Sequence, residues 1–379
     1  MEMHMTCKNM PDQAGTTAAC IRKNAPMRPH GLLALAALLL VGACTTLPKA
    51  SAPAASPGMT AIETPAAPVN TPEQDALRAR VALQDRLYRV AAPLLINDID
   101  LCRNNARRLL GFTAKNKYSY TSEYVDAAER SFGLGDRLHV MAVLAGSGAA
   151  QAGVRTGDIL VAVDDKPMPQ GPNAERLAAG ILGPLVASKS SVKLTLIRNN
   201  APVAPTVPLT TACAFAMELG NADNVNAYSD GHRVMLTRGM LRFVRSDTEL
   251  AYVIAREMAH SALGHATRLR MSATLGGIID NLIRIRPDMA AMSGTAGVKP
   301  FAQDVDAAAD TLSLYMLARA GYDIDGVQAF WQRLAGSHPA TELNGYTAIH
   351  PGTAYRLDVM SKIVPQVKGK QATHGVLSP

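Results

Sequence analysis

A 13-residue apolar run near the N-terminus, residues 31–43, limits what the first part of this chain can fold into. As a helix it would span about 20 Å, whereas the hydrocarbon core of a bilayer is about 30 Å thick. Arg28 precedes the run, and the small residues Gly42 and Ala43 end it just before Cys44. A cationic flank, a short apolar stretch and small residues before a cleavage point are typical of a secretory signal. We therefore predict that residues 1–43 form a signal peptide and take no part in the fold.

The end of this run resembles the bacterial lipobox, which is cleaved and acylated at its cysteine: Val41, Gly42, Ala43 and Cys44. The resemblance implies a lipid anchor on Cys44 and a periplasmic location. Thr45 follows the cysteine instead of Asp, which by the same resemblance favours the outer membrane. Met27 is a more ordinary start than Met1, so we interpret residues 1–26 as a mis-assigned extension. The alternative is a buried helix that happens to precede a cysteine.

The stretch after the cysteine differs sharply in composition from the rest of the chain. Residues 45–72 hold six prolines and seven alanines in 28 positions and almost no charge, which is typical of an extended tether. We therefore expect residues 44–72 to be the lipidated cysteine and a flexible linker. The whole chain has 379 residues, 48% of them hydrophobic and 18% charged, so the remainder can build a core and holds about two domains.

The formal net charge of +7 raises the question of nucleic-acid binding. The basic residues are scattered, and aromatic residues make up only 4% of the chain. Nucleic-acid-binding surfaces cluster Lys and Arg on one face and interleave aromatic side chains. We therefore expect no nucleic-acid partner, and we expect contact with a membrane only through the lipid anchor.

Residues 73–131 are predicted to be mainly helical. Thr71, Pro72 and Glu73 have the residue types of an N-cap and a first helical turn. Apolar residues then recur at helical spacing toward Leu110, and we expect a break before Pro93.

Residues 132–212 change to short apolar strands and glycine turns. Their central segment resembles a bacterial PDZ domain, and the matching positions are Ser147, Ala149, Ala152, Gly153, Val154, Gly157, Asp158, Ile159 and Leu160. PDZ domains bind extended peptides by strand addition and hold C-termini in a backbone nest. Gly133, Leu134 and Gly135 precede the first expected strand and are our candidates for that nest, although a single Gly-x-Gly is a weak signal.

Residues 213–366 alternate helices with a short strand region, and residues 367–379 form a tail. We predict strands at 224–228 and 234–237, a helix opened by a capping box at Ser246 and Glu249, and a second helix from Gln303 to Gly321. Phe330 is expected to pack in the core with its neighbour Trp331. Residues 272–302 are rich in Gly, Met and Ala and are interpreted as a flap or a partner surface.

The first of these two helices carries Arg256, Glu257 and His260, one substitution away from H-E-x-x-H. In that motif the two histidines, four residues apart, bind zinc on one helix face, and the glutamate is the general base. R-E-x-x-H alone says little, but the ordered set around it is more specific: residues 226–228, 236–239, 249–251, 306–310, 317–323 and 350–351. This set resembles the gluzincin metallopeptidase family forty-eight, the group of heat-shock membrane proteases, prenyl-protein proteases and periplasmic lipoprotein proteases.

The resemblance implies roles for individual residues. Glu257 falls on the general base, His260 on a zinc ligand and His350 on a His-Pro element beside the site. Asp306 falls on a ligand that is Glu in the family, with a reach shorter by about 1.5 Å. Asp310 falls on the residue that orients a ligand from outside the metal shell, and Arg356 falls on a downstream arginine.

Arg256 departs from the family pattern because it stands where the first ligand His is required. A guanidinium is always cationic and has no lone pair for a metal, so only His260 and Asp306 remain of the ligand set. Our hypothesis is that Arg256 replaces the metal electrostatically and forms a bidentate pair with Asp306. The alternatives are that Arg256 points into solvent, or that zinc still binds because His232 or His350 moves in.

Of the five cysteines, two precede residue 43 and Cys44 carries the lipid. Cys102 and Cys213 remain as an even pair in an oxidising compartment, on either side of the PDZ segment. They form either a disulfide or two buried free thiols.

We therefore expect an α+β protein: a mainly helical gluzincin-type domain with a small β-rich PDZ domain inserted after an N-terminal helical segment. The expected function is that of an impaired or inactive peptidase relative without zinc. It would bind envelope proteins or peptides through the PDZ domain and the peptidase cleft as a quality-control factor. One alternative is an active zinc endopeptidase that degrades misfolded envelope proteins. The other is a peptide-binding module in which the peptidase part is only a scaffold.

Overall fold

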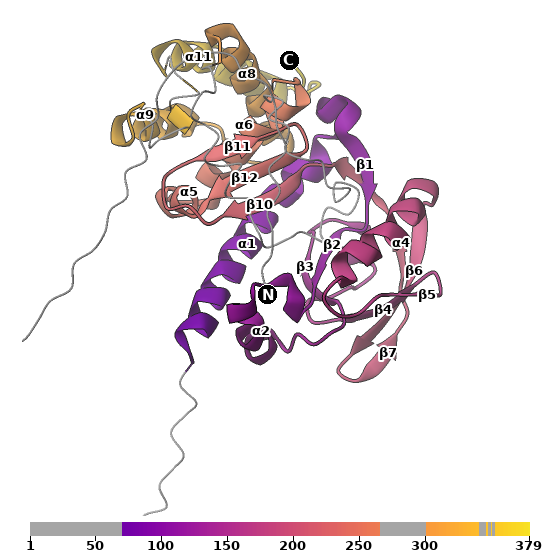
Figure 1. Ribbon diagram of the computed structural model, residues 1–379. Coiled ribbons are helices and arrows are strands. Elements are labelled where there is room, and N and C mark those ends of the chain that lie inside the picture. The colour runs from indigo at the N-terminus through magenta and orange to yellow at the C-terminus, as the bar shows by residue number, and fades with distance from the viewer. Residues whose placement is uncertain (1–69, 266–300, 341–345, 348–349, 351–352) are drawn as a thin grey trace, which may run out of the picture. The chain divides into compact units, whose positions relative to one another are not determined.

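The computed structural model describes residues 70–265, 301–340, 346–347, 350 and 353–379 (Figure 1). All of them belong to one compact unit that spans residues 67–379. The predicted signal peptide, Cys44, nearly all of the tether and residues 272–300 of the glycine- and methionine-rich segment lie outside the described residues. In the part of the chain that is described, no helix is long and apolar enough to cross a membrane.

The first helix, α1 (Pro72–Asn97), begins as the sequence predicts. Thr71 accepts from the backbone N–H of Gln74, and the Gln74 side chain accepts from the N–H of Thr71, which completes a capping box. The expected break before Pro93 is wrong, because the helix continues through Pro93 to Asn97. The turns around Pro93 are buried in the main core, so their packing offsets the hydrogen bond that proline removes.

The expectation of helix up to residue 131 is also wrong in its middle part. After a 3-10 helix, η1 (Ile99–Asn105), the chain forms two strands, β1 (Ala106–Leu109) and β2 (Phe112–Lys115). Two short 3-10 helices, η2 (Lys117–Ser119) and η3 (Ser122–Tyr124), lead into α2 (Val125–Phe132).

The PDZ-like part is one sheet with strand order β2-β3-β4-β6-β7, in which β5 also pairs with β4 and β8 with β6. Its elements are β3 (His139–Val143), α3 (Gly148–Gln151), β4 (Ile159–Val163), β5 (Lys166–Pro167), α4 (Ala174–Ser188), β6 (Ser191–Arg198), β7 (Ala201–Val203) and β8 (Thr206–Pro208). Alternating residues of β2, β4 and β6 pack against α4 in a core of their own. β2 therefore belongs to this sheet, and the sheet begins earlier in the chain than residue 132.

The peptidase-like part has a three-stranded sheet of order β10-β12-β11, in which β10 and β12 are parallel. Its elements are β9 (Thr210–Cys213), β10 (Ala216–Gly220), β11 (Ala227–Ser229), β12 (Arg233–Thr237), α5 (Arg238–Phe243), α6 (Asp247–Ala262), α8 (Gln303–Arg319), α9 (Val327–Ser337) and α11 (Thr353–Ala372). The predicted hairpin is present as β11 and β12, which pair antiparallel. Part of the predicted tail is helical, because α11 runs on to Ala372. Phe330 and Trp331 of α9 are buried in this core, as expected.

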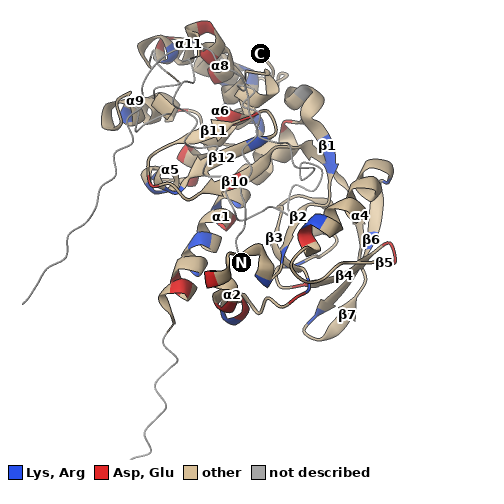
Figure 2. Cartoon of the chain, in the orientation of Figure 1, with Lys and Arg blue, Asp and Glu red and all other residues tan. Residues whose placement is uncertain are grey.

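A strand pair and a disulfide connect the two parts of the fold. β1 pairs antiparallel with β9, and the structure has a disulfide between Cys102 in η1 and Cys213 in β9. The PDZ-like part thus leaves and returns to the peptidase-like part at one point. Basic and acidic positions are interspersed along the described helices and strands of both parts (Figure 2).

Candidate functional site

Helix α6 positions the residues of the R-E-x-x-H motif. Ser246 caps it by accepting from the N–H of Glu249, and the Glu249 carboxylate binds Arg333 and the N–H of Arg245 rather than closing a reciprocal box. The helix is buried from its second turn onward, and Arg256 is fully buried. A fully buried arginine excludes the reading in which this side chain points into solvent.

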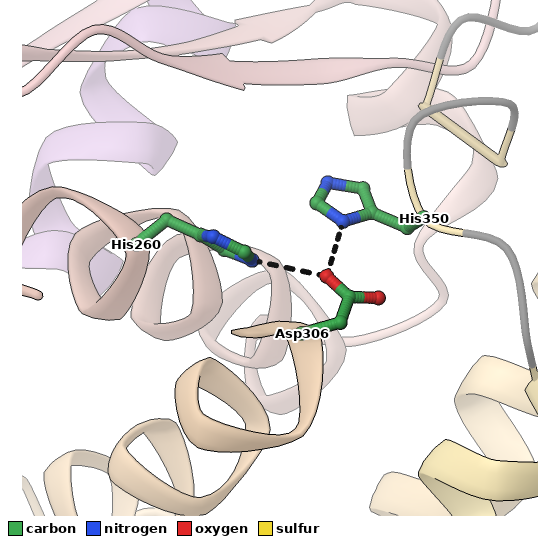
Figure 3. Close-up of side chains that lie close together, drawn as sticks. All are labelled: His260, Asp306 and His350. Atoms are coloured by element: carbon green, nitrogen blue, oxygen red, sulfur yellow. Dashed lines mark hydrogen bonds and ion pairs between the residues drawn. The ribbon is translucent and has the colours of Figure 1, made fainter. Parts of the chain in front are cut away.

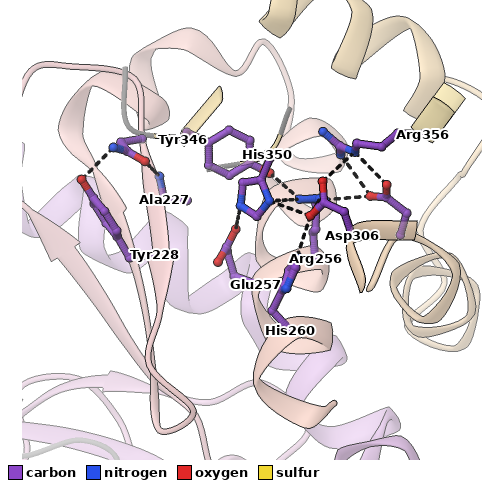
Figure 4. A network of polar contacts seen from close by, with 11 residues as sticks. Ala227, Tyr228, Arg256, Glu257, His260, Asp306, Tyr346, His350 and Arg356 are labelled. Carbon is purple, nitrogen blue, oxygen red and sulfur yellow. Dashed lines mark hydrogen bonds and ion pairs between the residues drawn. The ribbon is translucent and has the colours of Figure 1, made fainter. Parts of the chain in front are cut away.

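Arg256 bridges two carboxylates of α8 (Figure 4). Its Nη2 lies 2.6 Å from Oδ1 of Asp306, and its Nε donates to Oδ1 of Asp310 at 2.7 Å. Its Nη1 donates to the Tyr346 hydroxyl at 3.3 Å. The hypothesis of an ion pair with Asp306 thus agrees with the structure, but the bidentate geometry does not, because the guanidinium divides its donors between the two aspartates.

The bidentate pair is formed by Arg356 instead. Its Nε and Nη2 donate to the two oxygens of Asp310 at 2.7 and 3.0 Å. Both guanidiniums lie against the ring of Trp331, with centroid distances of 5.4 Å for Arg256 and 4.7 Å for Arg356. Tyr346 stacks on the same indole at 5.7 Å. Asp310 therefore anchors two arginines, and no histidine is among its hydrogen-bond partners in the described chain.

The two imidazoles converge on one oxygen of Asp306 (Figure 3). His350 Nδ1 lies 2.8 Å from Oδ1 and His260 Nε2 lies 3.4 Å from the same atom. Nδ1 of His350 is also 3.2 Å from Nη1 of Arg256, but a single nitrogen cannot both donate and accept. The shorter contact goes to a charged acceptor, so we assign the proton to Nδ1, donated to Asp306. Nε2 of His350 is then an acceptor, 3.7 Å from Oε1 of Glu257.

Several polar atoms at the centre of the site have no hydrogen-bond partner among the described residues. They are Nη2 of Arg256, whose contact with Asp306 is an ion pair, Oε1 of Glu257, both ring nitrogens of His260 and Oδ2 of Asp306, all on buried residues. A buried polar group without a partner costs about 1–3 kcal/mol. These atoms can still form hydrogen bonds, so a further polar group can bind to the cluster.

Burial and the arginines determine the protonation states. Burial lowers the pKa of His260 to about 4 and lowers that of His350 well below its ordinary value, so both imidazoles are neutral at pH 7. Burial alone would raise the pKa of Asp306, but Arg256 and the neighbouring imidazoles of His260 and His350 outweigh it and hold the pKa far below the usual range. Burial raises the pKa of Glu257 to about 7, against the opposing effects of Arg256 and Ser229.

A catalytic zinc ion needs three protein ligands and an open position for water. Ligand atoms of His260, Asp306 and His350 all lie within 4.8 Å of one another, as they would around a metal. However, three nitrogens already lie within 3.4 Å of Oδ1 of Asp306: Nη2 of Arg256, Nδ1 of His350 and Nε2 of His260. An acceptor oxygen therefore stands at the centre of the group, and a guanidinium holds it. In this arrangement the residues do not fit a resident zinc.

The charge balance supports the same conclusion. Arg256 and Arg356 bring two positive charges into the cluster, and Asp306 and Asp310 bring two negative charges. With neutral imidazoles and Glu257 near the midpoint of its titration, the sum is close to zero without a metal. A divalent cation would leave excess positive charge in a buried site, which is unfavourable.

The raised pKa of Glu257 makes a testable contribution to stability. Because the folded pKa of about 7 exceeds the reference value of 4.5, the folded state holds a proton that the unfolded state releases between those pH values. Stability from this group therefore falls as pH rises through that window. We expect Glu257→Gln to leave stability nearly unchanged at pH 4.5 and to raise it by about 1–3 kcal/mol at pH 8, measured by urea unfolding.

Glu249→Gln is the matched control for this prediction. Arg333 lowers the pKa of Glu249, so its contribution is present above the unfolded pKa and is lost as pH falls. This variant should therefore lose stability at pH 8 relative to pH 4.5, the opposite sign. A Glu257→Gln effect of equal size at both pH values would contradict a buried, proton-holding carboxyl.

The predicted peptide nest at residues 133–135 is a helix cap. Gly133 has φ +65° and donates its N–H to Glu129 O, and the N–H of Leu134 is directed to Ala128 O. Leu134 is buried with α1 and α2. The N–H groups of two of these three residues are thus directed to carbonyl oxygens of α2 and end that helix. The expectation of a carboxylate nest there is therefore wrong.

The structure places a different loop beside the free edge of the PDZ-like sheet. Strand β2 pairs only with β3 in the described sheet, and it follows Leu110 and Gly111 directly. Gly111 has φ +82°, and a Cβ there would lie 2.5 Å from Oγ of Ser147, so only glycine fits. From the sequence, residues 110–112 were assigned to the helical segment because they are apolar, so their place beside a sheet edge was not predicted. The glycine directly before a strand was the signal that could have identified this loop.

A helix carrying Glu257 and His260 against an aspartate of a following helix, beside a small PDZ-like sheet, defines a metallopeptidase-like protein with a peptide-binding module. Residues 203–364 match peptidase family M48, and residues 139–180 match the PDZ domain. The chain is therefore homologous to M48 metallopeptidases over its C-terminal part and carries a PDZ domain. M48 metallopeptidases are zinc-dependent.

Curated relatives match part of the chain. The beta-barrel assembly-enhancing protease of Yersinia pestis is 30% identical over 137 residues, which cover 32% of this chain and 28% of that protein. The protein of the same name from Escherichia coli K12 is 28% identical over 136 residues. Human mitochondrial metalloendopeptidase OMA1 is 23% identical over 180 residues, covering 42% of this chain and 34% of that one. The chain thus spans only about a third of the length of these relatives.

Solved structures also match part of the chain. The PDZ domain of HtrA3 bound to a phage-derived ligand is 21% identical, with a TM-score of 0.21, and covers 28% of this chain and 88% of that one. The HtrA-type protease AlgW with a decapeptide is 22% identical, with the same TM-score of 0.21, and covers 28% of this chain and 30% of that one.

Proposed function

We propose that this protein is a metallopeptidase relative that has exchanged its metal for an arginine and binds polypeptides without cleaving them. The observation that carries the proposal is the position of Arg256, fully buried and 2.6 Å from the carboxylate oxygen on which both imidazoles converge. A fixed cation there takes the electrostatic place of a metal but cannot polarise a carbonyl or activate water as a metal does. Glu257 then has no metal-bound water to deprotonate.

The binding role has two supports. In the cluster, Glu257, His260 and Asp306 have polar atoms without hydrogen-bond partners among the described residues, and a peptide group could bind to these atoms. The PDZ domain adds a second site of a kind that binds extended peptides by strand addition, here along the free edge of β2. The lipobox at Cys44 and the envelope relatives favour a lipid-anchored periplasmic protein, on the outer membrane, that handles misfolded or unassembled envelope proteins.

A second candidate is an active zinc endopeptidase. The convergence of His260, Asp306 and His350 within 4.8 Å favours it, because these three could ligate zinc if Arg256 withdrew from Asp306. This reading requires a buried guanidinium to leave two carboxylates, and metal content separates the two candidates.

We expect the purified full chain to hold less than about 0.1 zinc per molecule by mass spectrometry, and Arg256→His to hold about one, because a neutral imidazole restores a third ligand. Wild type should capture unfolded casein without cleaving it, and Arg256→His should cleave it. The control is the double variant Arg256→His with His260→Ala, which should lose the metal again. One tightly bound zinc in wild type that is lost in His350→Ala would establish the second candidate instead.

A further inference from the structure

The ring of Phe301 covers the two imidazoles of the site. Phe301 lies two residues before α8. Its ring stacks on His260 at 4.5 Å and on His350 at 5.3 Å, in both cases with planes 26° apart. Both histidines are buried, whereas Phe301 is only partly buried. Among the described residues, one partly buried aromatic side chain therefore lies against both buried imidazoles.

The site beside this ring keeps polar atoms without partners. Among the described residues, both nitrogens of His260 and Oε1 of Glu257, which lies 3.7 Å from Nε2 of His350, lack hydrogen-bond partners, and Phe301 can offer them none. A polypeptide brings amide N–H and C=O groups together with its side chains, so it could satisfy these atoms while its side chain takes the position of the ring. The site thus combines two imidazole faces that stack on an aromatic ring with polar atoms that can still form hydrogen bonds.

We propose that Phe301 occupies the subsite for an aromatic side chain of a bound extended polypeptide, whose adjacent peptide group binds Glu257 and His260. This inference rests on the proposed polypeptide-binding function and names its preferred ligand. The surface accepts a flat ring because two imidazole faces lie nearly parallel to it. Offset stacking of this kind favours an aromatic over an aliphatic side chain by roughly 2–10-fold in affinity.

The first experiment measures peptide affinity with the full chain by fluorescence anisotropy. The probes are two labelled unstructured octapeptides that differ only in one central residue, Phe or Ala. Phe301→Ala should bind the Phe peptide roughly 3–10-fold more tightly than wild type does, because the ligand no longer competes with an internal ring. Affinity for the Ala peptide should change less than 2-fold. Tyr355→Ala, which removes an aromatic side chain that is 42% exposed on α11, should leave both affinities unchanged.

The second experiment measures access to the imidazoles by carbethoxylation with diethylpyrocarbonate, followed by peptide mapping. His260 should react at least 5-fold faster in Phe301→Ala than in wild type, relative to the exposed His374 in the same sample. Excess Phe peptide should suppress this gain, whereas the Ala peptide should not. The readout does not depend on peptidase activity.

The outcomes separate the inference from the proposed function. If wild type binds both peptides but Phe301→Ala changes neither the Phe preference nor the carbethoxylation rate, the subsite is wrong and the binding function stands. Weaker binding in Phe301→Ala would show that the ring belongs to the binding surface, which also overturns the inference. If no form of the protein binds either peptide, polypeptide capture itself fails, and the subsite fails with it.

Discussion

Replacing Arg256 by methionine should lower the free energy of unfolding by about 3–5 kcal/mol, the largest effect that we expect from a single side chain. The reason is that Asp306 and Asp310 are both buried at 0% exposure, and the guanidinium binds both. Methionine fills a similar volume but leaves Asp306 as an uncompensated buried charge, because its other cation, Arg356 Nε, lies 3.7 Å away. The measurement is urea unfolding followed by the fluorescence of Trp331, the only tryptophan of the chain.

Two comparisons test the cause of this loss. Arg242→Met removes an ion pair with Asp223 whose side chains are 63% and 61% exposed, and it should cost less than about 1 kcal/mol. Adding Asp306→Asn to Arg256→Met should recover part of the loss, because the unpaired charge is then gone. If the double variant were as unstable as the sum of the two single variants, Arg256 and Asp306 would not act as a pair. The electrostatic account of Arg256 would then have to be abandoned.

Under the proposed function, a cation in the place of a ligand would let such a cluster persist without metal. Buried like charges oppose folding when nothing neutralises them. Arg256 contacts both Asp306 and Asp310 and supplies a positive charge between them. We therefore propose that the side chain that would block metal chemistry also stabilises the fold.

The sequence was most informative where local chemistry determines the structure. Thr71 and Ser246 begin helices because their hydroxyls accept from orphan N–H groups, and this requires only neighbouring residues. The contact of Arg256 with Asp306 could be anticipated because both positions fall in one site of the family that the sequence resembles. The sequence could not show how the guanidinium of Arg256 distributes its N–H donors. This depends on Trp331 of α9, Arg356 of α11 and Tyr346 between these helices, which all lie beside it in the folded chain.

Predictions failed where packing outweighs local preference. Pro93 usually ends a helix, yet the residues around it are buried in the main core and hold α1 together beyond it. Residues 106–115 have an apolar pattern that suits a helix or a strand, and only their partners β9 and β3 decide for strand. Gly133 and Gly135 resembled a nest in the sequence, but Gly133 is the left-handed residue that ends α2, and its N–H and that of Leu134 are directed to carbonyls of that helix.

The second large effect concerns the disulfide between Cys102 and Cys213. The two residues are 111 positions apart, so the bond closes a long loop that contains the whole PDZ-like sheet. Closing a loop of this length restricts the unfolded chain and is worth roughly 3–5 kcal/mol. We expect the Cys102→Ala, Cys213→Ala double variant to lose this amount in urea unfolding. Wild type under dithiothreitol should lose the same amount.

The PDZ-like core and the main core have no buried residue in common, so breaking the bond should also let the two parts unfold separately. The PDZ-like part would then be joined to the rest by the β1–β9 pairing and by its packing against α1 and α2. Calorimetry should show one transition in oxidised wild type and two in the double variant. Peptide mapping without reductant gives the direct control, because the two cysteines must appear in one cross-linked fragment. If reductant changes neither the stability nor the number of transitions, the cysteines are free thiols and the loop is held by strand pairing alone.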